Sequence, residues 1–130
     1  MPQIPDPFAI RLTGTDHRWQ AVYPAIGTAG PVVQELHAGS QLRVPVDTEI
    51  ILVLTSSDYI YTLAVPELGL KEIAVPGMEF RIMFRMTDLG QYSLINDELC
   101  GLPASGNVAR LVVEPRENFQ RQFTAKDDQH

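Results

Sequence analysis

Cys100 is the single cysteine of the chain and lies in a polar segment, residues 96–107, beside Asp97 and Glu98. Thiolates bind soft metal ions and act as nucleophiles when their pKa is lowered, so this segment is the first candidate for chemistry. One thiolate among hard oxygen donors, however, suits copper poorly and does not match a common zinc site. With one cysteine no intramolecular disulfide can form. The simpler interpretation is that Cys100 packs as a small hydrophobic residue.

The three histidines do not complete a metal site with Cys100. His17 and His37 lie in other segments, and His130 is the last residue. The carboxylates of Asp88 and Glu67 are not placed by the sequence beside a second acid for acid–base catalysis. No pairing of a serine or cysteine nucleophile with a histidine can be argued. We therefore expect no catalytic centre in this chain.

The composition narrows the class of protein and of partner. The chain has 130 residues, a net charge of −6 and a pI of about 4.9, which argues against a nucleic-acid partner because phosphate binding needs a basic patch. The first residues lack the basic and apolar regions of a signal peptide, and no stretch predicts a membrane span. The length predicts one domain over residues 1–130, with a core over about 8–114 and a tail over 116–130.

Short segments in which apolar and polar residues alternate predict the secondary structure. The expected strands cover residues 8–13, 19–23, 42–46, 78–86 and 108–114 and the apolar run 50–54, and turns rich in glycine and proline lie between many of them. We expect an all-β, antiparallel sandwich or barrel of seven or eight strands. The polar tail carries Phe119 and Phe123 four residues apart, so it would form a short helix on the sandwich.

Three ordered segments resemble one family. They read TSSDYIYTLAVPELGLK from Thr55, VPG from Val75 before the alternating strand, and LGQY from Leu89 followed by NDELCG from Asn96. These segments are similar to the soluble domain of cytochrome c oxidase subunit II, which holds the binuclear copper A centre. The resemblance extends over about residues 8–114, and it implies a cupredoxin-like Greek-key sandwich.

The resemblance implies a set of metal ligands, which we compared position by position. The family uses two cysteines, two histidines, a methionine and the backbone carbonyl of a glutamate. The corresponding residues here are Tyr61, Asn96, Glu98, Cys100, Ala104 and Asn107. Only Cys100 and Glu98 are kept, and copper centres of this kind need imidazole beside the thiolate. We therefore expect no copper A centre and no other cofactor.

Two more positions follow from the resemblance. The exposed tryptophan through which electrons enter in the family corresponds to His17, and a neighbouring structural tryptophan corresponds to Trp19. Tyr61 is expected to fill the volume of the lost imidazole and metal. His17 is then the electron-entry position without its indole ring, and a lone histidine on a strand usually has no special role.

Two functions remain open at this point. The first is a non-redox structural or interaction module associated with a respiratory oxidase, on the periplasmic or extracytoplasmic face of the membrane. The alternative is an electron-transfer or copper-handling cupredoxin with an altered site that uses Cys100. The expected partner is an oxidase subunit or another respiratory protein, and exposed strand edges would allow a homodimer. A third explanation for the missing ligands is their deliberate replacement. The residues around the ligand positions also differ from the family, which disfavours this explanation.

Overall fold

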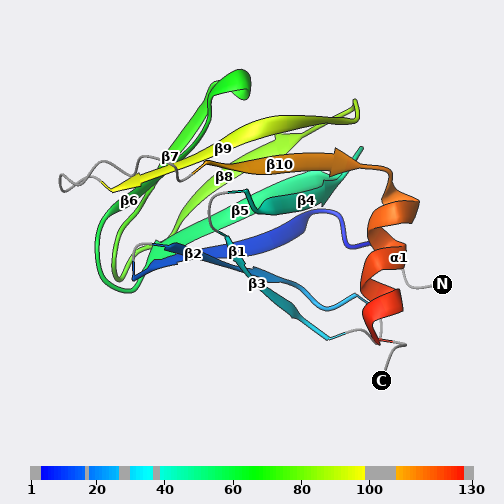
Figure 1. Ribbon diagram of the computed structural model, residues 1–130, viewed down its shortest axis with the longest axis horizontal. Helices are drawn as coiled ribbons and strands as arrows, with labels where there is room; N and C mark the ends of the chain where they lie inside the picture. Colours follow the sequence, from blue (N-terminus) through cyan, green and yellow to red (C-terminus); the bar gives the residue numbers. More distant parts are fainter. Residues whose placement is uncertain (1–3, 17, 27–29, 37–38, 99–107, 128–130) are drawn as a thin grey trace.

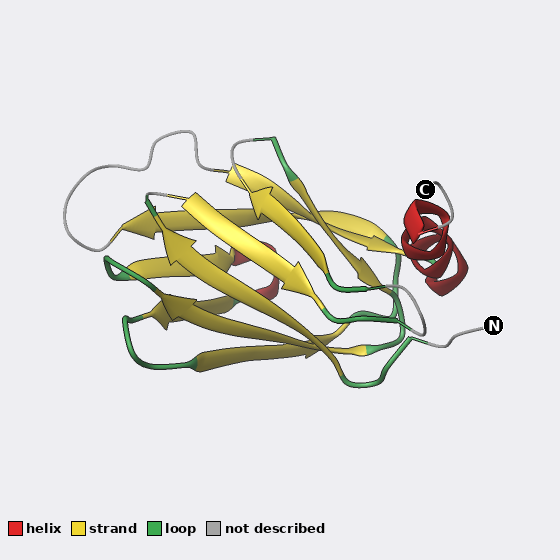
Figure 2. Ribbon diagram, turned by 90° about the horizontal axis from the view of Figure 1, so that it is seen from below, coloured by secondary structure: helices red, strands yellow, loops and turns green. Residues whose placement is uncertain are grey.

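The computed structural model describes residues 4–16, 18–26, 30–36, 39–98 and 108–127. Over these residues it contains ten strands in two five-stranded sheets. The two sheets pack face to face (Figures 1 and 2). The first sheet has the order β3 (Val32–Leu36), β2 (Arg18–Tyr23), β1 (Phe8–Thr15), β5 (Glu49–Ser56) and β8 (Phe80–Arg85). The second has the order β4 (Gln41–Pro45), β10 (Val108–Glu114), β9 (Gly90–Glu98), β6 (Tyr61–Val65) and β7 (Leu70–Ala74).

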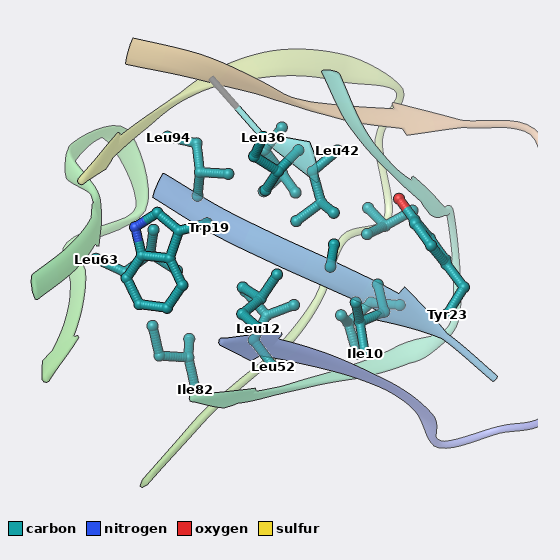
Figure 3. Close-up of a cluster of buried hydrophobic side chains, with 14 of the residues drawn as sticks. Ile10, Leu12, Trp19, Tyr23, Leu36, Leu42, Leu52, Leu63, Ile82 and Leu94 are labelled. Atoms are coloured by element: carbon teal, nitrogen blue, oxygen red, sulfur yellow. The ribbon is translucent and has the colours of Figure 1, made fainter. Parts of the chain in front are cut away.

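Alternation along the strands puts the core between the two sheets. In β1 and β5 every second side chain is fully buried, as for Ile10, Leu12 and Leu52, and Leu42 of β4 meets them from the other sheet (Figure 3). Each such side chain stabilises the fold by about 1.5–3 kcal/mol through its removal from water. The predicted all-β sandwich is therefore confirmed, and its stability comes from a continuous inter-sheet core.

The strands are more numerous than predicted, and their pairing is not wholly antiparallel. Among the described residues, β1 pairs parallel with β5 and β4 pairs parallel with β10. An alternating pattern fixes which face of a strand is buried but does not encode the direction of its neighbour. The extra strands include β3, where Val33 is exposed, and the pair β6 and β7, which a short 3-10 helix at Pro66–Leu68 joins.

Helix α1 (Arg116–Asp127) covers one end of the sandwich, which confirms the predicted helical tail up to Asp127 (Figure 1). Phe119 is 1% exposed and meets Phe8 edge-on, with ring centroids 5.3 Å apart. It also lies 6.1 Å from the ring of Tyr23. Phe119 therefore anchors the helix on the core. Within the described part of the chain, no helix is both long enough and apolar enough to cross a membrane.

Tyr23 links the two sheets beside this helix. Its hydroxyl donates to the carbonyl of Arg43 and accepts the backbone N–H of the same residue, both at 2.9 Å. The side chain of Gln34 donates to the carbonyl of Gln41 at 2.8 Å. Residues of the first sheet thus satisfy backbone groups of β4, which is one of the two edge strands of the second sheet. Burial raises the pKa of the Tyr23 phenol, so it stays protonated.

Candidate functional site

The candidate site lies at the end of the sandwich opposite α1, which we call the loop end. It comprises the turn between β1 and β2, the loop at residues 57–60 between β5 and β6, and the first residue of β6, Tyr61. Tyr61 is 2% exposed. In the register of β6 and β9 its Cα atom faces that of Glu98. The first position of β6 is therefore built into the core rather than presented to solvent.

The ring of Tyr61 fills the space between the two sheets at this end. It packs edge-on against Trp19, with ring centroids 5.5 Å apart and planes at 60°. The ring also contacts Gly14 of β1, which pairs with Trp19 in the β1–β2 register. A Cβ atom on Gly14 would lie 2.5 Å from Cδ1 of Tyr61, which is closer than atoms can approach. Gly14 is therefore needed for this ring, not for a special backbone angle.

The hydroxyl of Tyr61 donates to Oδ1 of Asp58 at 2.8 Å. The same carboxylate accepts the backbone N–H of Tyr59 at Oδ1 and that of Asp16 at Oδ2, both at 2.6 Å. Asp16 has a positive φ of 50°, which aspartate tolerates better than most residues. Hydrogen bonds to an ionised acceptor are shorter and stronger than neutral ones. Asp58 is thus the polar centre of the loop end.

Two serines complete this network. The backbone N–H of Ser57 donates to the carbonyl of Gly14 at 3.0 Å, and its hydroxyl donates to Oγ1 of Thr15 at 2.7 Å. The hydroxyl of Ser56 accepts the N–H of Asp58 at 3.1 Å and donates to the carbonyl of Tyr59. The serines explain why the loop turns tightly, because short hydroxyl side chains can replace backbone partners in turns.

The described residues do not offer the donor set of a copper A centre. Tyr61, which the sequence comparison aligns with the first imidazole of the family, carries a phenol whose oxygen is already bonded to Asp58. A phenol oxygen is a harder donor than the imidazole and thiolates that suit copper. No group of three histidine, cysteine, aspartate or glutamate side chains within the described ranges lies close enough to hold a metal ion.

The structure describes only some of the residues that the sequence singled out. Cys100, Ala104, Asn107 and His17 lie outside the described residues. Asn96 and Glu98 belong to β9, where their Cα atoms face those of Leu63 and Tyr61, and of these two the structure describes only the backbone. The predicted structural tryptophan, Trp19, is 1% exposed in the core. The structure thus brings the Tyr61 and Glu98 positions together across two strands.

Sequence reasoning missed the structural roles of Asp58 and Glu67. Glu67 follows the end of β6 in the short 3-10 helix, and both its oxygens accept the N–H of Ser93 in β9 at 3.0–3.1 Å. It also accepts the Ser93 hydroxyl at 2.9 Å. These bonds lower the pKa of the Glu67 carboxyl. The kept PELGLK segment therefore has a local structural role, and the only sequence signal for it was an acid directly after a strand-ending proline.

Comparisons with known proteins agree with this architecture. The family model described as cytochrome C oxidase subunit II, periplasmic domain, matches residues 21–115. Cytochrome c oxidase subunit 2 of Thermostichus vulcanus is 30% identical over 118 residues, which cover 91% of this chain and 33% of that protein. The Synechocystis protein of the same name is 31% identical over 96 residues, covering 74% of this chain and 26% of that protein. The chain thus spans about a quarter to a third of these relatives.

A solved structure extends the likeness to the whole fold. The periplasmic domain of subunit II of cytochrome oxidase of Bradyrhizobium japonicum superimposes with a TM-score of 0.79 at 25% identity, covering 97% of this chain and 99% of that one. Residues 21–115, which match the family model, include β6 and β9, where Tyr61, Asn96 and Glu98 lie. The chain therefore belongs to the family of cytochrome c oxidase subunit II periplasmic domains.

Proposed function

We propose that this chain is a subunit II domain without the binuclear copper A centre, acting as a non-redox structural or interaction module of a respiratory oxidase. It would have no catalytic site of its own and would work on the periplasmic or extracytoplasmic face of the membrane. The family membership supports the association with an oxidase. The loss of the copper centre rests on a separate observation.

The observation that carries the proposal is the environment of Tyr61. At the position of the first imidazole in the family resemblance, its side chain is buried, packs on Trp19 and bonds to Asp58. A side chain that fills its space and satisfies its hydroxyl gains nothing from a metal and would have to leave both partners to make room for one. The sequence adds Asn96, Ala104 and Asn107 at three further ligand positions.

Copper titration tests the missing centre. The reduced protein would be titrated with copper while its visible and electron paramagnetic resonance spectra are recorded. We expect weak, non-specific uptake without intense thiolate-to-copper bands, and the same result for Cys100→Ser. Near-stoichiometric copper with strong bands that disappear in Cys100→Ser would overturn the proposal.

That contrary result would favour the second candidate, an altered copper site for electron transfer or copper handling. One observation supports it: the Glu98 position faces Tyr61 across β6 and β9, so two positions of the family's ligand set still converge. Cys100 follows Glu98 two residues later. The obstacle to this second candidate is the missing imidazole, which blue-copper and binuclear centres both require.

The partner is tested separately from the metal. The tagged full-length protein would be purified from membranes of its native host and its companions identified by mass spectrometry. We expect subunits of a haem-copper oxidase, and their absence would remove the oxidase from the proposal. Recovery of the chain only with copies of itself would instead support the homodimer that exposed edges allow.

A further inference from the structure

We infer that Asp58 is a positioning residue that holds three segments of the loop end in one arrangement. The three segments are the β1–β2 turn at Asp16, the loop residue Tyr59 and the first residue of β6, Tyr61. One donor from each reaches the same carboxylate, at 2.6, 2.6 and 2.8 Å. The inference rests on these three hydrogen bonds and not on a role of the chain in an oxidase.

The network matters because it joins the two sheets. Asp16 belongs to the turn of a hairpin in the first sheet, whereas Tyr61 begins β6 in the second. Backbone ladders hold each sheet together but cannot join one sheet to the other. At the loop end Asp58 makes this connection with directional bonds, and the Tyr61 ring adds apolar contact with Trp19. The carboxylate thereby fixes the position of the hairpin relative to β6.

The backbone of Asp16 shows what the carboxylate holds in place. Its φ of 50° lies in the left-handed region, which costs free energy for a residue other than glycine and persists only where surrounding contacts fix it. The bond from its N–H to Asp58 is such a contact, and Arg18 donates to the Asp16 carboxylate at 3.2 Å. Removing the Asp58 oxygen should therefore release this turn before any other part of the fold.

A preformed loop end has a consequence for binding. A protein that docks on this end would not have to order the hairpin and the β5–β6 loop, so less free energy would be lost on association. Asp58 gives this order by accepting hydrogen bonds from the β1–β2 turn, from its own loop and from the start of β6 at one carboxylate. The inference concerns the organisation of the surface and leaves the identity of the partner to the experiments above.

The test is amide hydrogen exchange of the metal-free full chain, read at Asp16 and Tyr59. Asp58→Asn keeps the shape of the side chain but leaves one acceptor oxygen where there were two. We expect exchange at Asp16 to rise by about tenfold, which is typical of a lost charge-assisted bond that protected a local structure. The amide of Val46, which donates to Glu114 at the other end, should change by less than about twofold.

Two variants make the outcome decisive. Asp88→Asn removes an exposed charge at the other end of the sheet and should leave the Asp16 amide unchanged. Ser57→Ala removes only the bond to Thr15 and should raise exchange at Asp16 less than Asp58→Asn does. Unchanged exchange at Asp16 in Asp58→Asn would overturn the inference. Equal acceleration at Asp16 and Val46 would also overturn it, because the residue would then support overall stability rather than local position.

Discussion

The two ends of the sandwich are held together by different kinds of contact. At the helix end, the rings of Phe119, Phe8 and Tyr23 pack against one another with little exposure to water. At the loop end, a carboxylate collects hydrogen bonds from three segments, and Asp58 itself is exposed. Apolar packing stabilises the whole fold, whereas directional polar contacts fix local geometry at a smaller net gain in free energy. The helix end is therefore held mainly by apolar packing, and the loop end by a network of hydrogen bonds.

The largest effect is expected at the helix end. Phe119→Ala removes a fully buried ring and should lower the free energy of unfolding by about 3–5 kcal/mol. Denaturant unfolding followed by circular dichroism would measure this loss. Asn118→Ala, on the exposed side of the same helix, is the matched control and should have little effect. A loss below about 1 kcal/mol for Phe119→Ala would mean that α1 does not contribute to the core as its contacts indicate.

The next effect concerns the close contact at the loop end. Gly14→Ala would force the Tyr61 ring to move, and we expect a loss of about 1–3 kcal/mol from overpacking. In a Tyr61→Ala background the same change should cost little, because the ring is no longer there. The coupling free energy from this double-mutant cycle tests the contact directly. Equal costs in both backgrounds would show that Gly14 is needed for another reason.

A smaller effect is expected for the Tyr61 hydroxyl. Tyr61→Phe keeps the ring on Trp19 but removes the bond to Asp58, and should cost about 1 kcal/mol of unfolding free energy. Thermal or denaturant unfolding would measure it. If Tyr61→Phe proved as destabilising as Tyr61→Ala, the hydroxyl rather than the ring would dominate this position, and the contrast between the two ends would weaken.

The smallest effect is the pH dependence of Glu67. Its pKa is lowered in the folded state by bonds from Ser93, so its contribution is present above the unfolded pKa, about 4.3, and is lost as the pH falls through the lower folded value. Relative to Glu67→Gln, the wild type should therefore be more stable at neutral pH and lose that advantage in acid. Glu117→Gln serves as an exposed control. An advantage of the wild type that persists in acid would contradict the assignment.

Sequence reasoning reached the all-β sandwich but not the contacts around Tyr61. Alternation in β1 and β8 identifies buried faces, the apolar run of β5 indicates a buried strand, and three ordered segments identify the family. The role of Asp58 depends on the register between the β1–β2 turn and the β5–β6 loop, which are 42 residues apart for the Asp16 contact. No local pattern encodes such a meeting. The same applies to Gly14. The need for a glycine at this position follows only from the Tyr61 ring, which the other sheet places against it.

The hydroxyl of Tyr23 has a consequence for how the chain behaves at high concentration. An edge strand with unsatisfied N–H and carbonyl groups can recruit a strand from another molecule and start aggregation. On β4, the Tyr23 hydroxyl forms hydrogen bonds with the N–H and the carbonyl of Arg43, and the Gln34 side chain donates to the carbonyl of Gln41. Pro45, also in β4, has no N–H. These contacts leave the outer edge of β4 with fewer backbone groups for a strand of another molecule, and because the pKa of Tyr23 is raised, its phenol keeps its proton in the alkaline range as well.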